Sequence, residues 1–176
     1  MEHKEYIIPF SGLKEGRHEY HYKVDNKFFQ SFDFREFNAA SIDVFVHLDK
    51  RSTVLEFEFQ ATGTVNVDCD LSSEPFDLPI NATLALLVKF GEEFDDEDDE
   101  ILILPHGEHQ VNIAQYVYEM LVLAVPAKRV HPGVLDGSLR SELLVKLKEL
   151  QPGESKNKDK HTDPRWDALK NFLTDK

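Results

Sequence analysis

The feature that most constrains the fold is a period-two alternation of apolar and polar residues through the middle of the chain. The apolar positions are Val44, Val46, Leu48, Leu55, Phe57, Phe59, Val65, Val67, Cys69, Phe76, Leu78, Ile80, Leu84, Leu86, Val88 and Phe90. Short polar segments such as residues 49–52 separate the alternating stretches. Such alternation is typical of antiparallel strands with one buried and one solvated face. We therefore expect an antiparallel sheet, which could close toward a barrel.

Two helices are predicted to pack on this sheet. Asn112 is a good N-cap residue, Gln115 follows three positions later, and apolar residues then recur at helical spacing. Residues 138–150 predict a second, amphipathic helix. Its inward positions are expected to be Leu143, Leu144, Leu147 and Leu150. The predicted fold class is therefore α+β.

The chain is expected to contain one domain followed by a tethered segment. Residues 1–150 hold all the strands and both helices predicted above. Residues 151–162 are rich in Lys, Glu, Pro and Gly and lack apolar anchors, which predicts a flexible linker. In residues 163–176, Asp163 can cap a short helix that begins at Pro164. We expect this final segment to form a C-terminal helical arm.

Composition limits the compartment and the partners. The single cysteine excludes an intrachain disulfide and fits a reducing compartment. The charged start and the short apolar runs predict a cytoplasmic protein that does not associate with a membrane. The net charge is −13, with 11 basic and 26 acidic residues over positions 1–139 but 9 and 7 over positions 140–176. The acidic body is thus unsuited to clamping naked nucleic acid.

Three short patterns carry a family resemblance. The first is VDCDLSSEPFDLPI at residues 67–80. The second is LAVP at residues 123–126, with His131 five residues after the proline, and the third is DPRW at residues 163–166, closing with Leu169. Their order and spacing resemble the YceD family, bacterial proteins linked to accumulation of the large-subunit ribosomal RNA. The resemblance covers roughly residues 63–173.

The resemblance implies a non-enzymatic factor that supports 23S ribosomal RNA accumulation or large-subunit assembly. The implied partner is a ribosomal protein or a ribosomal RNA-processing complex, with at most indirect or weak contact to RNA. Two alternatives remain open. One is an interaction adaptor unconnected to ribosomes, and the other is a hydrolase that uses a cluster of carboxylates.

The first pattern departs from the family at its cysteines. Family members often carry Cys-x-x-Cys with an Arg between, whereas here Cys69 is followed by Leu71 at the Arg position and Ser72 at the second Cys position. Members with more cysteines suggest a metal site, but the thiolates for one are missing, so we expect no metal. Cys69 could be a reactive thiol or a buried structural residue. Strand parity favours burial, and the adjacent Asp68 and Asp70 would raise its pKa.

Six residues are candidates for partner binding, namely Lys128, Arg129, His131, Asp163, Arg165 and Trp166. His131 precedes Pro132-Gly133, so it could be a turn residue bonded to the backbone or a partner contact. The arm that carries Arg165 and Trp166 could be a plain capped helix or a docking element. If RNA is touched directly, the expected phosphate contacts are Lys128, Arg129, Lys156, Lys158, Lys160 and Arg165.

An acidic run is the remaining candidate site. Its members are Glu92, Glu93, Asp95, Asp96, Glu97, Asp98, Asp99 and Glu100. Self-repulsion predicts a mobile, solvated loop. The alternatives are contact with a basic ribosomal protein, nucleic-acid mimicry, or a divalent cation site, although the spacing of a calcium loop is missing.

Catalytic motifs are missing from the sequence. It contains no glycine-rich phosphate loop, no nucleophile elbow and no His-x-x-x-His pair. We therefore expect no catalytic residues, no cofactor and no small-molecule substrate.

Overall fold

A computed structural model describes residues 3–98, 100–139 and 141–150. These residues belong to two compact units, Met1–Arg140 and Ser141–Lys176, which are described separately. The predicted linker, residues 151–162, and the predicted arm, residues 163–176, lie outside the described residues and stay predictions. In the described part of the chain, every helix is too short or too polar to cross a membrane.

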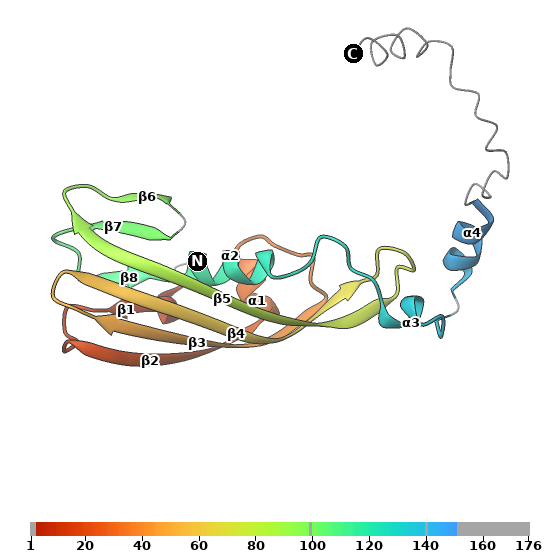
Figure 1. Ribbon diagram of the computed structural model, residues 1–176, viewed down its shortest axis with the longest axis horizontal. Helices are drawn as coiled ribbons and strands as arrows, with labels where there is room; N and C mark the ends of the chain where they lie inside the picture. Colours follow the sequence, from red (N-terminus) through yellow and green to blue (C-terminus); the bar gives the residue numbers. More distant parts are fainter. Residues whose placement is uncertain (1–2, 99, 140, 151–176) are drawn as a thin grey trace, which may run out of the picture. The chain divides into compact units, whose positions relative to one another are not determined.

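The first unit is built on a six-stranded sheet of order β2-β3-β4-β5-β7-β6. The strands are β2 (Gly16–Asp25), β3 (Ala39–Lys50), β4 (Val54–Asp68), β5 (Pro75–Gly91), β6 (Asp95–Asp98) and β7 (Ile101–Pro105). Strands β2 to β5 form an antiparallel meander, whereas β7 runs parallel to β5 and antiparallel to β6. The sheet is open, with β2 and β6 at its edges (Figure 1), so the predicted sheet is confirmed without closing into a barrel.

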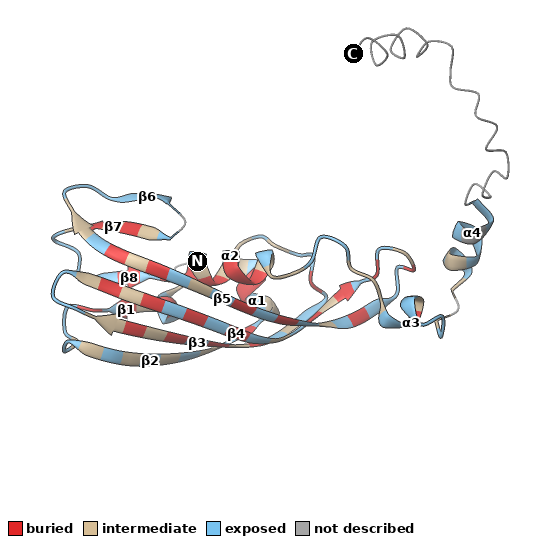
Figure 2. Cartoon of the chain, in the orientation of Figure 1, coloured by how far each residue is buried: buried red, intermediate tan, exposed pale blue. Residues whose placement is uncertain are grey.

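The core lies against one face of this sheet. Buried and exposed residues alternate along β3, β4 and β5 (Figure 2), as the period-two pattern predicts. Leu55, Phe57 and Phe59 on β4 are each at most 1% exposed. Removing side chains of this size from water contributes about 1.5–3 kcal/mol each, which makes this face the main source of stability.

Short elements cover the buried face. They are a 3₁₀ helix (Lys4–Tyr6), β1 (Ile7–Pro9), α1 (Asn26–Ser31), β8 (Gln110–Asn112) and α2 (Ala114–Leu123), and β1 pairs with β8. Aromatic rings join them, because Tyr118 of α2 stacks on Phe32 just after α1, with ring centroids 4.4 Å apart. Figure 1 shows α1 and α2 beside each other over the middle of the sheet. The helix that packs beside α2 on the sheet is therefore α1.

The cap of α2 forms one residue earlier than a standard N-cap. The Asn112 side-chain oxygen accepts a hydrogen bond from the Ala114 N–H at 3.0 Å, while Ile113 occupies the N-cap position. Val117 and Leu121 on the inner side of the helix are fully buried. Leu123 at the last turn is 83% exposed. The amphipathic stripe thus holds α2 on the sheet, but Leu123 remains in solvent.

The second predicted helix, over residues 138–150, is present as α4. Among the described residues, α2 is followed by α3 (Pro132–Leu135) in the first unit and by α4 (Glu142–Leu150) in the second. Leu143, Leu147 and Leu150 of α4 are 45%, 42% and 79% exposed. Because α4 belongs to the second unit, the expectation that these leucines pack inward on the sheet stays a prediction. A pattern of leucines at helical spacing specifies an apolar side of a helix, but it does not specify what covers that side.

Candidate functional site

The first sequence pattern forms a tight corner between β4 and β5. The Cys69 N–H donates to the Glu74 carbonyl at 2.9 Å, and the Ser73 N–H donates to the Cys69 carbonyl at 2.8 Å. Ser73 adopts a φ of 56°, in the left-handed region that residues other than glycine seldom occupy. These main-chain bonds hold that conformation, so the corner is a defined structure.

The second pattern is joined to this corner through Asp70 and Arg129. Their main chains pair through the Asp70 N–H and the Arg129 carbonyl at 2.8 Å, and the Arg129 N–H donates to Asp70 Oδ2 at 2.6 Å. The Arg129 guanidinium lies 3.6 Å from Asp70 Oδ1 and 3.5 Å from Glu36 Oε2. Arg129 is therefore engaged by two carboxylates, whereas the neighbouring Lys128 is exposed.

Cys69 and His131 also meet at the corner. Cys69 is 2% exposed, which confirms its predicted inward position. Its sulfur accepts the His131 N–H at 3.3 Å, and the Nδ1 atom of His131 accepts the Gly133 N–H at 2.8 Å, capping α3. His131 is thus a turn residue bonded to the backbone, the first of its two predicted roles, while contact with a partner stays a prediction.

The environment of the Cys69 sulfur lowers its pKa. Burial alone would raise the thiol pKa, but hydrogen bonds from the His131 N–H, the Ser72 hydroxyl and the amides of Leu71 and Ser72 outweigh it. The sequence-based expectation of a raised pKa is therefore wrong. That expectation was based on the flanking aspartates alone. It could not include the hydrogen-bond donors that the turn and the segment around His131 bring to the sulfur.

The residues of this corner do not fit a metal ion. The lone pairs of the Cys69 sulfur and of His131 Nδ1 already accept N–H donors, and Ser72 supplies a hydroxyl in place of a thiolate. Within residues 3–98, 100–139 and 141–150, no group of three or more His, Cys, Asp and Glu is arranged to hold an ion. The corner is a hydrogen-bonded junction between two distant segments.

The acidic run is structured differently from its prediction. Residues Asp95–Asp98 form β6, an edge strand on β7, instead of a loop. Pairing with β7 satisfies main-chain groups that its edge would otherwise expose. All four side chains of β6 are exposed, so their like charges are solvated and screened. The concentration of charge therefore predicted that these side chains are solvated, but it did not predict that their backbone forms a strand.

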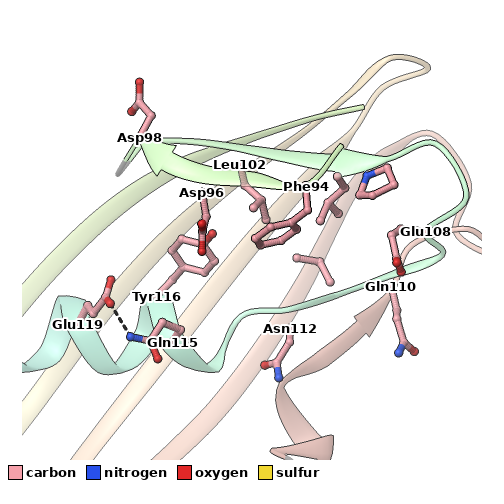
Figure 3. A pocket seen from close by; sticks show the side chains of 13 residues that line it. Phe94, Asp96, Asp98, Leu102, Glu108, Gln110, Asn112, Gln115, Tyr116 and Glu119 are labelled. Atoms are coloured by element: carbon pink, nitrogen blue, oxygen red, sulfur yellow. Dashed lines mark hydrogen bonds between the residues drawn. The ribbon is translucent and has the colours of Figure 1, made fainter. Parts of the chain in front are cut away.

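A groove lies between this acidic strand and α2 (Figure 3). Its volume is about 440 Å³. Apolar lining comes from Phe94, Leu102, Leu104, Pro105, Val111 and Tyr116, and carboxylates come from Asp96, Asp98, Glu108 and Glu119. The strands β6 and β7 form one wall, and β8 with α2 forms the other (Figure 3). The site thus combines an apolar surface with concentrated negative charge.

The hydroxyl of Tyr116 lies in the negative electrostatic field of the groove. Burial raises the pKa of its hydroxyl, and the negative charges of Asp96 and Glu119 raise it further. Two carboxylates from opposite walls therefore act on the same point. Gln115 donates a side-chain hydrogen bond to Glu119, which orients that carboxylate along α2 (Figure 3).

The two candidate sites are separate. The corner lies where β5 begins at Pro75, and β7 pairs with β5 only from Leu87 onward. At 3.3 Å per residue, twelve residues of strand separate them by about 40 Å. The fold brings Lys128, Arg129 and His131 together at one end and the acidic run at the other. Asp163, Arg165 and Trp166 lie outside the described residues.

Sequence reasoning missed several groove residues, notably Phe94, Tyr116 and Glu119. Phe94 offered a signal, because a large aromatic residue interrupts a run of eight acids. That signal does not identify a groove without the antiparallel placement of β6 on β7.

Comparison with models of known protein families identifies the family of the chain. The family model described as "Large ribosomal RNA subunit accumulation protein YceD" matches residues 57–173. The match covers well over half of the chain and includes both the corner and the groove, so the chain belongs to the YceD family. This confirms the resemblance seen in the sequence and links the chain to accumulation of large-subunit ribosomal RNA. No curated protein and no solved structure matches the chain.

Proposed function

We propose that this chain supports accumulation of large-subunit ribosomal RNA as a non-enzymatic factor that binds a basic protein partner. That partner is a ribosomal protein or a component of a ribosomal RNA-processing complex. The observation that carries the proposal is the groove between β6 and α2, in which an apolar floor is rimmed by four carboxylates. Family membership supports the ribosomal context.

The charge of the chain favours protein over RNA at this groove. Carboxylates repel phosphates, and a net charge of −13 extends that repulsion over the body. Ribosomal proteins and other RNA-binding proteins carry the opposite charge. Complementary fields speed encounter and reject wrong partners, while burial of apolar surface supplies affinity. The groove offers both contributions at one place.

In the proposed mechanism, the chain comes close to RNA because it binds a protein that contacts RNA. The body engages a basic protein through the groove, and the predicted C-terminal arm, with Arg165 and Trp166, lies nearest to RNA. Of the basic residues near the corner, Lys128 is exposed and Arg129 is paired with Glu36 and Asp70. Lys128 is therefore the better of the two for an additional phosphate contact.

Depletion of the chain in its own cells tests the function. We expect mature 23S ribosomal RNA to fall relative to the small-subunit ribosomal RNA, with accumulation of precursors and fewer large subunits. Re-expression of the unaltered chain should restore all three. Normal levels of precursor and mature RNA, with normal subunit profiles, would contradict the proposal.

Co-purification at low salt tests the mode of action. We expect ribosomal proteins or processing factors to elute with the chain, and to be lost when salt is raised to screen the groove. An eluate without ribosomal or RNA-processing proteins would instead support an adaptor unconnected to ribosomes.

A further inference from the structure

The groove continues along α2 beyond the part drawn in Figure 3. A second hollow of about 520 Å³ lies between α2 and β5. It is lined by Asn81, Ala82, Thr83, Leu84, Glu100, Tyr116, Glu119, Met120, Leu123 and Ala124. Tyr116 and Glu119 line both hollows, so the two meet at these side chains. We call the combined feature the α2 channel.

Each of the two hollows of the α2 channel is lined by one exposed, large apolar side chain. Phe94 in the first hollow is 57% exposed, and Leu123 in the second is 83% exposed. Single exposed apolar residues are common on proteins, but two that line adjoining hollows are typical of a binding surface. Tyr116, which lines both hollows, and Met120, which lines the second, add to this apolar lining.

The charge along the α2 channel has one sign. Its carboxylates are Asp96, Asp98, Glu100, Glu108 and Glu119. None of the described residues that line the two hollows is Lys, Arg or His. The channel also offers neutral hydrogen-bonding groups on Asn81, Thr83 and Gln115. An occupant must therefore be basic, partly apolar, and able to use polar groups of its own main chain.

We propose that the α2 channel binds an extended peptide segment in which lysine or arginine residues alternate with apolar residues. This deepens the proposed function, because it names the part of a basic protein partner that the groove recognises. The ten residues of α2 span about 15 Å, which corresponds to four or five residues of extended chain. Apolar side chains enter the floor near Phe94 and Leu123, and cationic ones face the carboxylate rim.

Charge excludes the other kinds of occupant. A nucleic acid strand would place phosphates among five carboxylates. A second copy of this chain would bring another body with 26 acidic and 11 basic residues within positions 1–139. Both arrangements concentrate like charge, whereas a basic segment neutralises it.

The test uses the full chain and a fluorescent six-residue probe, Lys-Leu-Lys-Leu-Lys-Leu, followed by fluorescence anisotropy at low salt. Two matched probes replace either every Lys by Glu or every Leu by Ser. We expect saturable binding of the Lys-Leu probe and much weaker binding of both others. Absence of saturable binding, or equal binding of the Glu-Leu probe, would overturn the inference.

Paired variants locate the binding. Asp96→Asn with Glu119→Gln removes two charges from the channel and should weaken binding roughly two- to thirtyfold, the usual strength of two exposed ion pairs. Asp95→Asn with Glu97→Gln removes two charges from the same strand but outside the channel lining, and should change binding less than about twofold. Equal weakening by both pairs would refute specific recognition.

A second pair tests the apolar contact. Leu123→Ser should weaken binding roughly tenfold, because it removes an apolar side chain that the probe covers. Leu135→Ser on α3 changes a residue that is 78% exposed and outside the channel lining, so it should leave binding unchanged. Unchanged binding in Leu123→Ser would contradict the proposed position of the peptide. Both leucines are exposed, so neither change should disturb folding.

The outcomes separate this inference from the proposed function. If depletion leaves ribosomal RNA normal while the Lys-Leu probe binds as expected, the ribosomal role fails and the channel assignment stands. If depletion lowers 23S ribosomal RNA but the Asp96→Asn, Glu119→Gln chain restores it fully, the ribosomal role stands and the channel is not its partner site.

Discussion

Substitution of Asp70 tests whether the corner stabilises the fold by joining two distant segments. Asp70→Ala removes the acceptor of the Arg129 N–H, at 2.6 Å, and the carboxylate 3.6 Å from its guanidinium. A hydrogen bond to a charged group contributes about 1.5–3 kcal/mol, and an exposed ion pair adds about 0.2–1 kcal/mol. The Asp70 side chain is 35% exposed, which favours the lower values. We expect a loss of about 2 kcal/mol.

The conservative change Asp70→Asn separates the two contributions. It keeps an oxygen acceptor and removes the charge, so we expect a loss of about 1 kcal/mol. The main-chain bond from the Asp70 N–H to the Arg129 carbonyl, at 2.8 Å, is available in both variants. Glu74→Ala, at an exposed carboxylate in the same turn, is the matched control and should change stability little.

Urea unfolding of the full-length variants measures these differences. With a denaturant slope of about 2 kcal/mol per molar, Asp70→Ala should lower the midpoint by about 1 M. Hydrogen exchange of the Arg129 and His131 amides should also become faster, because the second segment opens from the corner. An Asp70→Ala midpoint equal to that of Glu74→Ala, with unchanged exchange, would refute the stabilising role of this junction.

Three further predictions follow from the same contacts. Gly63→Ala should destabilise the chain by about 1–3 kcal/mol in thermal unfolding, because the alanine Cβ would lie 2.3 Å from the Ser41 carbonyl oxygen. The control Gly12→Ala should be nearly neutral, because the space around Gly12 is open. Cys69 should react slowly with a thiol reagent despite its lowered pKa, because the thiol is buried, and fast reaction in the native state would contradict that burial. Burial, followed by the charges of Tyr20 and Glu5, raises the pKa of Tyr22 to about 12. The folded state thus favours its neutral form, and stability should be intact below pH 10 and fall between about pH 10 and 12. Tyr22→Phe should flatten that fall in pH-dependent unfolding, and an unchanged slope would show that other groups cause it.

The strands were predictable because burial on one face imposes a local pattern. Alternation at β4 identified Phe57 and Phe59 as inward residues, and both are 1% exposed. The same parity placed Cys69 inside correctly. It could not give the pKa of Cys69, because the donors around its sulfur include the His131 N–H, which lies 62 residues away.

The acidic run shows the opposite case. Local charge favours a loop, and the sequence near Asp96 gives no sign of strand pairing. Its backbone is ordered by β7, which lies between β6 and β5 after the chain has reversed direction. Hydrogen bonding across that edge outweighs the propensity of the run, as tertiary context often does for strands.

The local pattern of residues was thus sufficient for the α+β class, the inward face of the long strands, the acidic character of the body and membership of the YceD family. Each of these can be read from local patterns, from their order along the chain or from composition, without knowledge of contacts between distant segments. The junction of Asp70 with Arg129 and the α2 channel between β6 and α2 depend on segments that are distant in sequence. Their positions follow from packing and strand order, because the contacts that define them form only when the whole sheet is assembled.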